Sequence, residues 1–141
     1  MQTFSGSQAL AFLCLCTAGS LLGTAALTKL LAAPQSMSSN ITGCWLAVSC
    51  TIGAGAAAYI LRHQFGRPGH LGALVALAGI INVTFVSSVV SGSLLIPIFG
   101  TMFGPWLMFG HILEGNIAVL PWVLSLYAFH LTRGGELSAY F

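Results

Sequence analysis

His111 and Glu114 are the residues whose types and spacing could do chemistry. They stand in the stretch 111–116, which reads HILEGN inside an otherwise apolar region. Side chains three residues apart lie on one face of a helix. If a helix starts at Pro105, Glu114 lies roughly 13 Å along it, and a carboxylate at such a depth in a bilayer marks a functional candidate. Glu114, with His111 and Asn116, is therefore the candidate site for a proton, an ion or a partner contact.

Three interpretations of Glu114 stay open. In a carrier site, Glu114 is the titrating group and His111 is its partner. In a metal site, the two residues supply only two ligands, and no other segment has a Glu or Asp in its middle. In a structural role, Glu114 lies in a hydrated kink or at the membrane surface and hydrogen-bonds locally or to a partner protein. We favour the structural role and predict no metal site.

The sequence contains no recognisable catalytic set. Its only acidic residues are Glu114 and Glu136, and Asp is absent. A Ser–His–Asp set, paired carboxylates and a nucleotide-binding glycine loop with Lys are all missing, so the main hydrolytic and phosphoryl-transfer chemistries lack their parts. We predict no catalytic residue and no enzyme activity of its own, although the chain could be a non-catalytic subunit of an enzyme complex.

The other histidines fall near predicted membrane boundaries. Two histidines on facing helices at matched depth could hold a haem, but His63 and His70 flank one short loop and so belong to one membrane face. His130 comes shortly before Arg133. This placement favours interfacial side chains, and we predict no cofactor, haem and quinone included.

The composition places the chain in a membrane. It has 141 residues, of which 57% are hydrophobic and 4% charged, whereas soluble domains carry about 25% charged residues. With so few charged residues, most of the surface of the protein must face the lipid bilayer or other apolar protein. The net charge of +2 is too sparse for a nucleic-acid partner. We expect a single transmembrane domain over residues 1–141.

Four apolar segments are long enough to span a bilayer, which takes about 20 residues. The predicted spans are about 8–31, 41–61, 71–96 and 105–131, and the predicted fold is an all-α membrane bundle with short loops. The first span lacks the positive start of a signal peptide and is read as a retained helix. For the fourth, we favour one helix kinked at Pro121 over a re-entrant piece in 97–115 followed by a span starting near Asn116.

Charge and aromatic residues suggest an orientation. With four spans, Arg62, Arg67 and Arg133 share one side and Lys29 lies on the other. The positive-inside rule then puts both termini on the cytoplasmic side, in a bacterial inner membrane or an organellar membrane. Aromatic residues that prefer the interface stand mostly near span ends: Trp45, Tyr59, Trp106, Trp122 and Tyr127.

Small and polar residues recur at helical spacing. Small residues let membrane helices approach closely, and they form two helix-packing rows: Gly19 and Gly23, and Ser49, Gly53 and Ala57. A polar stripe of hydroxyl residues follows in the third segment: Thr84, Ser87, Ser88 and Ser91. We expect the stripe to bond locally or to a neighbouring helix, with a hydrated path as the alternative. The cysteines are expected to be small buried residues: Cys14, Cys16, Cys44 and Cys50.

These features predict a small polytopic subunit of a larger membrane complex, such as an energy-transducing, secretion or transport assembly. The grounds are the small size, the scarcity of charge, the missing catalytic sets and the small-residue rows that need neighbours. The alternative is a small homo-oligomeric transporter or channel that moves protons or cations with Glu114 and His111. Partners are therefore lipid and other membrane subunits, or further copies of the chain.

Overall fold

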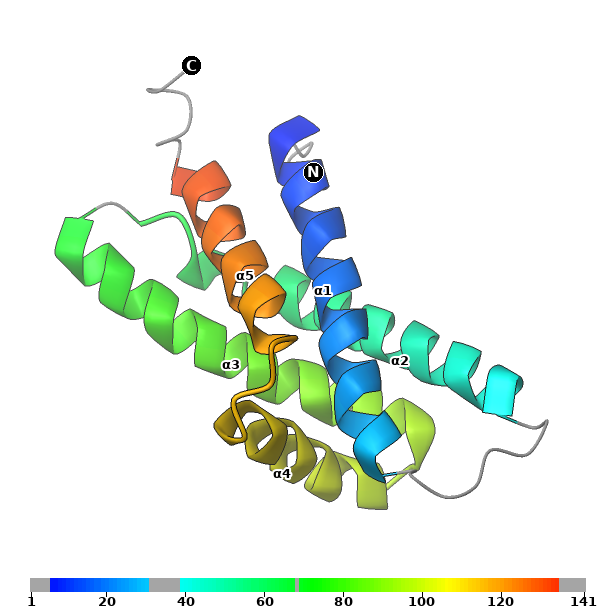
Figure 1. The fold of residues 1–141 in the computed structure, drawn as a ribbon. Coiled ribbons are helices and arrows are strands. Elements are labelled where there is room, and N and C mark those ends of the chain that lie inside the picture. Colours follow the sequence, from blue (N-terminus) through cyan, green and yellow to red (C-terminus); the bar gives the residue numbers. More distant parts are fainter. Residues whose placement is uncertain (1–5, 31–38, 68, 135–141) are drawn as a thin grey trace.

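A computed structural model describes residues 6–30, 39–67 and 69–134, and these residues form helices and short connections. In chain order the elements are α1 (Gly6–Leu30), α2 (Ser39–Ile60), the 3₁₀ turn η1 (Arg62–Gln64), α3 (Gly69–Leu95), α4 (Phe99–Leu113) and α5 (Val119–Gly134) (Figure 1). The described residues contain no strand, so the predicted all-α class is confirmed.

Three of these helices are long and apolar enough to cross a bilayer, over Gly6–Ala26, Gly43–Ile60 and Leu71–Leu95. They support the prediction of an integral membrane protein. The fourth predicted span is wrong as one continuous helix, because α4 and α5 are separate helices of 15 and 16 residues. At 1.5 Å per residue each is about 22 to 24 Å long, less than the roughly 30 Å of the hydrocarbon core.

Local chemistry explains the break between α4 and α5. Gly115 has a φ of 72°, the left-handed conformation that commonly ends a helix and that glycine adopts at no steric cost. The side-chain oxygen of Asn116 then accepts a hydrogen bond of 2.9 Å from the backbone N–H of Ala118 at the start of α5. The predicted kink at Pro121 is absent because Pro121 lies in the first turn of α5, where its missing N–H has no partner to lose.

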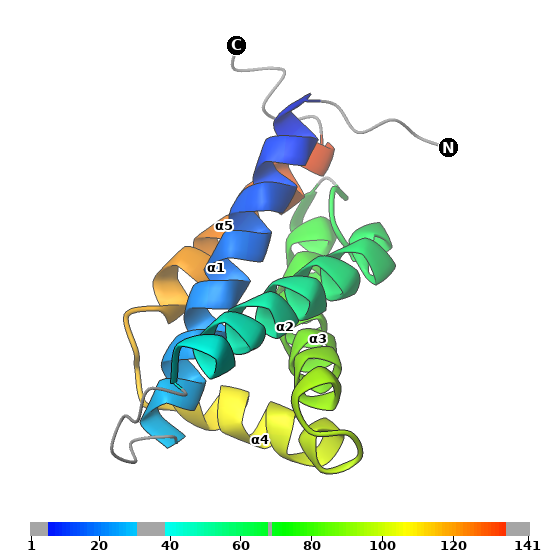
Figure 2. The same ribbon diagram turned by 90° about the vertical axis from the view of Figure 1, so that its right-hand side faces the viewer.

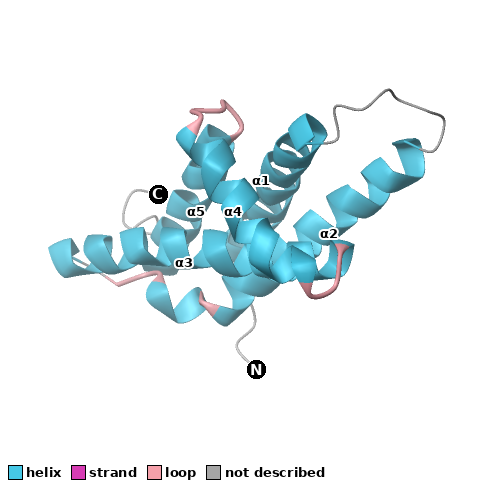
Figure 3. Cartoon of the chain, turned by 90° about the horizontal axis from the view of Figure 1, so that it is seen from below, coloured by secondary structure: helices cyan, strands magenta, loops and turns pink. Residues whose placement is uncertain are grey.

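The helices pack as two crossed layers with α4 at one end. α1 and α5 run antiparallel beside each other, and α2 and α3 cross them (Figures 1 and 2). α4 turns back beneath α3, at the opposite end of the bundle from the first turn of α1 and the last turn of α5. Figure 3 shows the molecule from the end that α4 covers.

Glycines, which have no side chain, let the backbones of α3 and α4 come into contact. Gly92 and Gly100 face each other, and an added Cβ at either would meet the carbonyl oxygen of the other. One turn further along α4, a Cβ on Gly104 would meet the carbonyl of Ser88. This tight hairpin fixes which side of α4 is packed against the bundle.

The core lies between α1, α2, α3 and α5. Its largest fully buried side chains are Trp122, Phe129, Leu15, Leu22, Leu126 and Val83. Gly19 of α1 leaves space for Ala54 of α2 and for the indole of Trp122, and Gly23 leaves space for Cys50. The small residues of α1 and α2 therefore find their neighbours within the chain.

The turn after α2 is fastened to the end of α5. The backbone N–H of Gly66 donates a 3.0 Å hydrogen bond to Nδ1 of His130, and the rings of Phe65 and Phe129 meet edge to face at 5.6 Å. A Cβ on Gly66 would collide with Arg133. The arginine-bearing turn and the last turn of α5 thus lie together, and the membrane side that they face stays a prediction.

Candidate functional site

The end of α4 places His111 and Glu114 side by side but in different surroundings. His111 lies in the last turn of α4, and Glu114 is the first residue beyond it. Nδ1 of His111 is 3.7 Å from Oε2 of Glu114, and the two side chains are 3% and 58% exposed. The depth of roughly 13 Å expected for Glu114 does not apply, because α4 begins at Phe99 and not at Pro105. The imidazole points inward and the carboxylate reaches the surface of the chain.

The second nitrogen of His111 is the exceptional atom of this site. Nε2 is buried, and within the described part of the chain no hydrogen-bond partner reaches it. A buried polar group without a partner costs about 1 to 3 kcal/mol, so native proteins keep few of them. Such an atom can be satisfied by an incoming water, proton or ligand. The pair therefore joins an orphaned buried nitrogen to an exposed carboxylate.

The side-chain carbonyl oxygen of Asn116 does not bond to His111 or Glu114. Its Oδ1 accepts the hydrogen bond from Ala118 that begins α5. The same connection borders a shallow hollow against α1, with Leu21 and Thr24 on the other side. In this arrangement Asn116 shapes the chain that follows Glu114.

The polar stripe of α3 is packed between helices. All four of its residues are buried. The hydroxyls of Thr84 and Ser88 donate to backbone carbonyls of α3 itself, at 2.8 and 2.7 Å, and Ser87 and Ser91 lie against Gly53 of α2. The packing leaves the stripe in contact with α2, α4 and α5.

Trp122 holds an unexpected place. We expected it at a membrane interface, but its side chain is 2% exposed. Its Nε1 donates a 2.9 Å hydrogen bond to Oγ1 of Thr84. The interfacial assignment is therefore wrong for Trp122. The buried indole N–H needs a hydrogen-bond acceptor, and the polar stripe supplies one.

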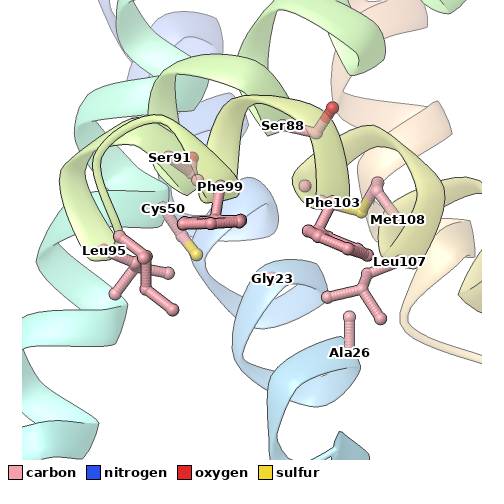
Figure 4. Close-up of a pocket in the computed structure, with 14 residues that line it drawn as sticks. Gly23, Ala26, Cys50, Ser88, Ser91, Leu95, Phe99, Phe103, Leu107 and Met108 are labelled. Carbon is pink, nitrogen blue, oxygen red and sulfur yellow. The ribbon is translucent and has the colours of Figure 1, made fainter.

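An apolar cavity that the sequence did not reveal lies between α1, α2, α3 and α4. Its volume is about 290 Å³. Phe99 and Phe103 of α4 face Gly23 and Ala26 of α1 across it, with Cys50 at one side (Figure 4). The pattern that could have indicated it is the set of glycines on three helices, but glycine spacing alone also fits close contact.

The remaining candidate ligands are scattered. No group of three His, Cys, Asp or Glu side chains that could hold a metal occurs among the residues described. His130 accepts the hydrogen bond from Gly66, and the side chain of His70 lies outside what the structure describes. Cys16 and Cys50 are buried as expected, but the expectation is wrong for Cys14 and Cys44, which are exposed on the apolar surface.

The outer side of α4 carries an unusually exposed row of large apolar side chains. In the described ranges, six large hydrophobic residues are at least 76% exposed, and five of them fall between residues 98 and 117. They are Ile98, Met102, Trp106, Leu113 and Ile117. Met102, Trp106 and Leu113 share one face of α4, because spacings of four and seven residues return to the same side of a helix. We call these three residues the outer row.

Comparison with protein-family models, with curated proteins and with solved structures finds no significant match to this chain.

Proposed function

We propose that this protein is a small polytopic subunit of a larger membrane assembly, and that it docks through the outer row of α4. The observation that carries the proposal is the exposure of Met102, Trp106 and Leu113 on a helix too short to span the bilayer. An energy-transducing, secretion or transport assembly fits this chain, since the sequence offers no recognisable catalytic set.

The composition of the outer row supports docking to protein. Trp and Met are enriched in the buried centre of protein interfaces, and Trp is among the residues whose truncation costs most binding energy. Trp106 is 79% exposed in the isolated chain, so a partner has nearly the whole indole to cover. Removing such an anchor commonly costs 2 kcal/mol or more of binding free energy.

The test is purification of the tagged protein from its native membrane in mild detergent. A larger partner should accompany the wild type in fixed stoichiometry, and Trp106→Ala should release it. Leu71→Ala is the matched control, because Leu71 is equally exposed but lies on α3. Circular dichroism verifies that both variants remain helical. Recovery of the wild type without a larger partner contradicts the proposal, as does equal release by both variants.

A second candidate function is movement of protons or cations by a homo-oligomer. The orphaned Nε2 of His111 beside the exposed Glu114 carboxylate favours it. Interrupted helices with ionisable groups at the break are the usual framework of ion sites in membrane transporters. In this function Glu114 takes up the cation or proton from outside the chain, and His111 is its neighbour toward the interior.

Glu114→Gln distinguishes this candidate from the subunit proposal. The substitution removes the charge and keeps nearly the same size, so assembly should survive while proton or cation flux into liposomes disappears. Flux at the wild-type rate in the Gln variant excludes Glu114 as the transporting group. If Trp106→Ala loses flux but its oligomer is unchanged, Trp106 does more than dock a partner.

A further inference from the structure

The cavity beside α4 has walls that exclude water. Its polar lining is confined to Ser88 and Ser91. The Ser88 hydroxyl already donates to the carbonyl of Phe85, and the Ser91 hydroxyl lies against Gly53. A buried water needs two to four polar partners, and apolar cavities without them stay dry. The cavity therefore suits an apolar occupant.

The position of the cavity and of its opening indicates where an apolar occupant would come from. The lining includes Gly23, Cys50 and Ser91, which belong to the three candidate membrane spans. Cys50 is buried, whereas Phe99 and Phe103 on the α4 wall are more than half exposed, so the cavity opens to the surface of the chain at these two rings. In a bilayer, the molecules that surround this opening are lipid hydrocarbon tails.

The size of the cavity also favours a tail. An apolar cavity of about 150 Å³ can hold one benzene molecule, and this one is nearly twice as large at about 290 Å³. It can take a segment of a hydrocarbon chain, but it offers no charged group for a headgroup. An unfilled void would forfeit the dispersion contacts of every wall atom.

We propose that this cavity binds one acyl chain of a membrane phospholipid, which enters between Phe99 and Phe103 of α4 and ends near Cys50 of α2. The bound chain fills the gap between α1 and α4, which otherwise share few contacts. It thereby supports the end of the bundle on which the outer row lies. The site is separate from His111 and Glu114, neither of which lines the cavity.

The test uses phosphatidylcholine with a photoreactive diazirine near the end of one acyl chain, in vesicles of phosphatidylcholine and phosphatidylglycerol that contain the full chain. Adducts are mapped by peptide mass spectrometry. We expect adducts at Cys50 and Met108, which line the cavity but are too buried for bulk lipid to reach. Leu10 and Leu71 are exposed and report reaction with bulk lipid in every sample.

Ala26→Phe should fill the cavity from α1 and abolish the adducts at Cys50 and Met108. Ala9→Phe is the matched control, because it adds the same side chain to an exposed position of the same helix and should leave those adducts intact. Leu107→Trp fills the cavity from α4 and serves as the second variant if Ala26→Phe does not fold.

Three results overturn the proposal. One is labelling at Leu10 and Leu71 of the wild type with none at Cys50 and Met108. Another is undiminished labelling of the buried pair in both filled variants. The third comes from a parallel sample with a diazirine-bearing isoprenoid, and it is labelling of the buried pair by the isoprenoid but not by the phospholipid.

Discussion

The hydrogen bond between Trp122 and Thr84 gives the sharpest test of how α5 is held. Nε1 of Trp122 donates to Oγ1 of Thr84 at 2.9 Å, and the same hydroxyl donates to the carbonyl of Ile80 at 2.8 Å. Thr84→Val nearly preserves the shape of the side chain and removes the acceptor. The indole N–H is then left in the core without its partner.

The expected loss follows from that burial. Side-chain hydrogen bonds measured in a membrane protein average about 0.6 and reach about 1.7 kcal/mol, while a buried donor left unpaired costs about 1 to 3 kcal/mol. Because the Trp122 side chain is 2% exposed, we expect Thr84→Val to lower the free energy of unfolding by about 1 to 2 kcal/mol. In a Trp122→Phe background the donor is absent, and the same substitution should cost much less.

Equilibrium unfolding in mixed detergent micelles, followed by far-ultraviolet circular dichroism, measures both differences. The four proteins of the double-mutant cycle yield the coupling free energy of the pair, which we expect to be about 0.6 to 1.7 kcal/mol. Thr84→Ser keeps the hydroxyl and should retain the coupling. Equal costs of Thr84→Val in the two backgrounds would refute the reasoning.

Two further predictions concern helix contacts. Gly100→Val should push α4 away from α3, since even a Cβ at this position meets the backbone of α3, and it should lower the free energy of unfolding by about 1 to 3 kcal/mol. Gly110→Ala in the same helix is the control, because a Cβ there meets nothing within 4 Å and should not destabilise the protein. Equal losses of stability in the two variants would contradict the contact between α3 and α4. His130→Ala removes the acceptor of the Gly66 N–H and should cost about 0.5 to 1.5 kcal/mol. In His130→Ala, hydrogen exchange at the Gly66 amide should become faster. His63→Ala is the control, because His63 is exposed and its loss should leave the exchange rate of Gly66 unchanged. Slow exchange in both variants would show that another group protects this amide.

The sequence predicts the three long helices well because each is a long apolar run with few competing signals. The prediction of one helix over 105–131 is wrong because two kinds of signal conflict in that stretch. Pro121 suggested a kink in one helix, whereas Gly115 followed by Asn116 indicates a helix end and a new start. The local hydrogen bonds of Asn116 decide the outcome, since a proline in a first turn is no obstacle.

The sequence predicts that His111 and Glu114 lie side by side, but it does not predict that one side chain is buried and the other exposed. The packed side of α4 follows the row Gly100, Gly104 and Met108, and His111 continues that row by helical spacing. The imidazole is buried because the glycines dock this side of α4 onto α3. Glu114 would extend the same row, but the helix ends at Leu113 and the carboxylate turns outward. Such a difference depends on the helix end, which hydropathy does not report.

The structure also changes the argument for a partner. In sequence, the small residues of the second segment indicate helix faces that need neighbours, either within the chain or in another subunit. In the fold, Gly53 packs on Ser87 and Ser91 of α3, and Ala57 is fully buried. That requirement is therefore met inside the chain. Large apolar side chains are exposed on every described helix, but most of those with the greatest exposure lie on or beside α4, a helix too short to span the bilayer by itself. The case for a partner protein thus rests on Trp106 and its neighbours, and no longer on the glycines.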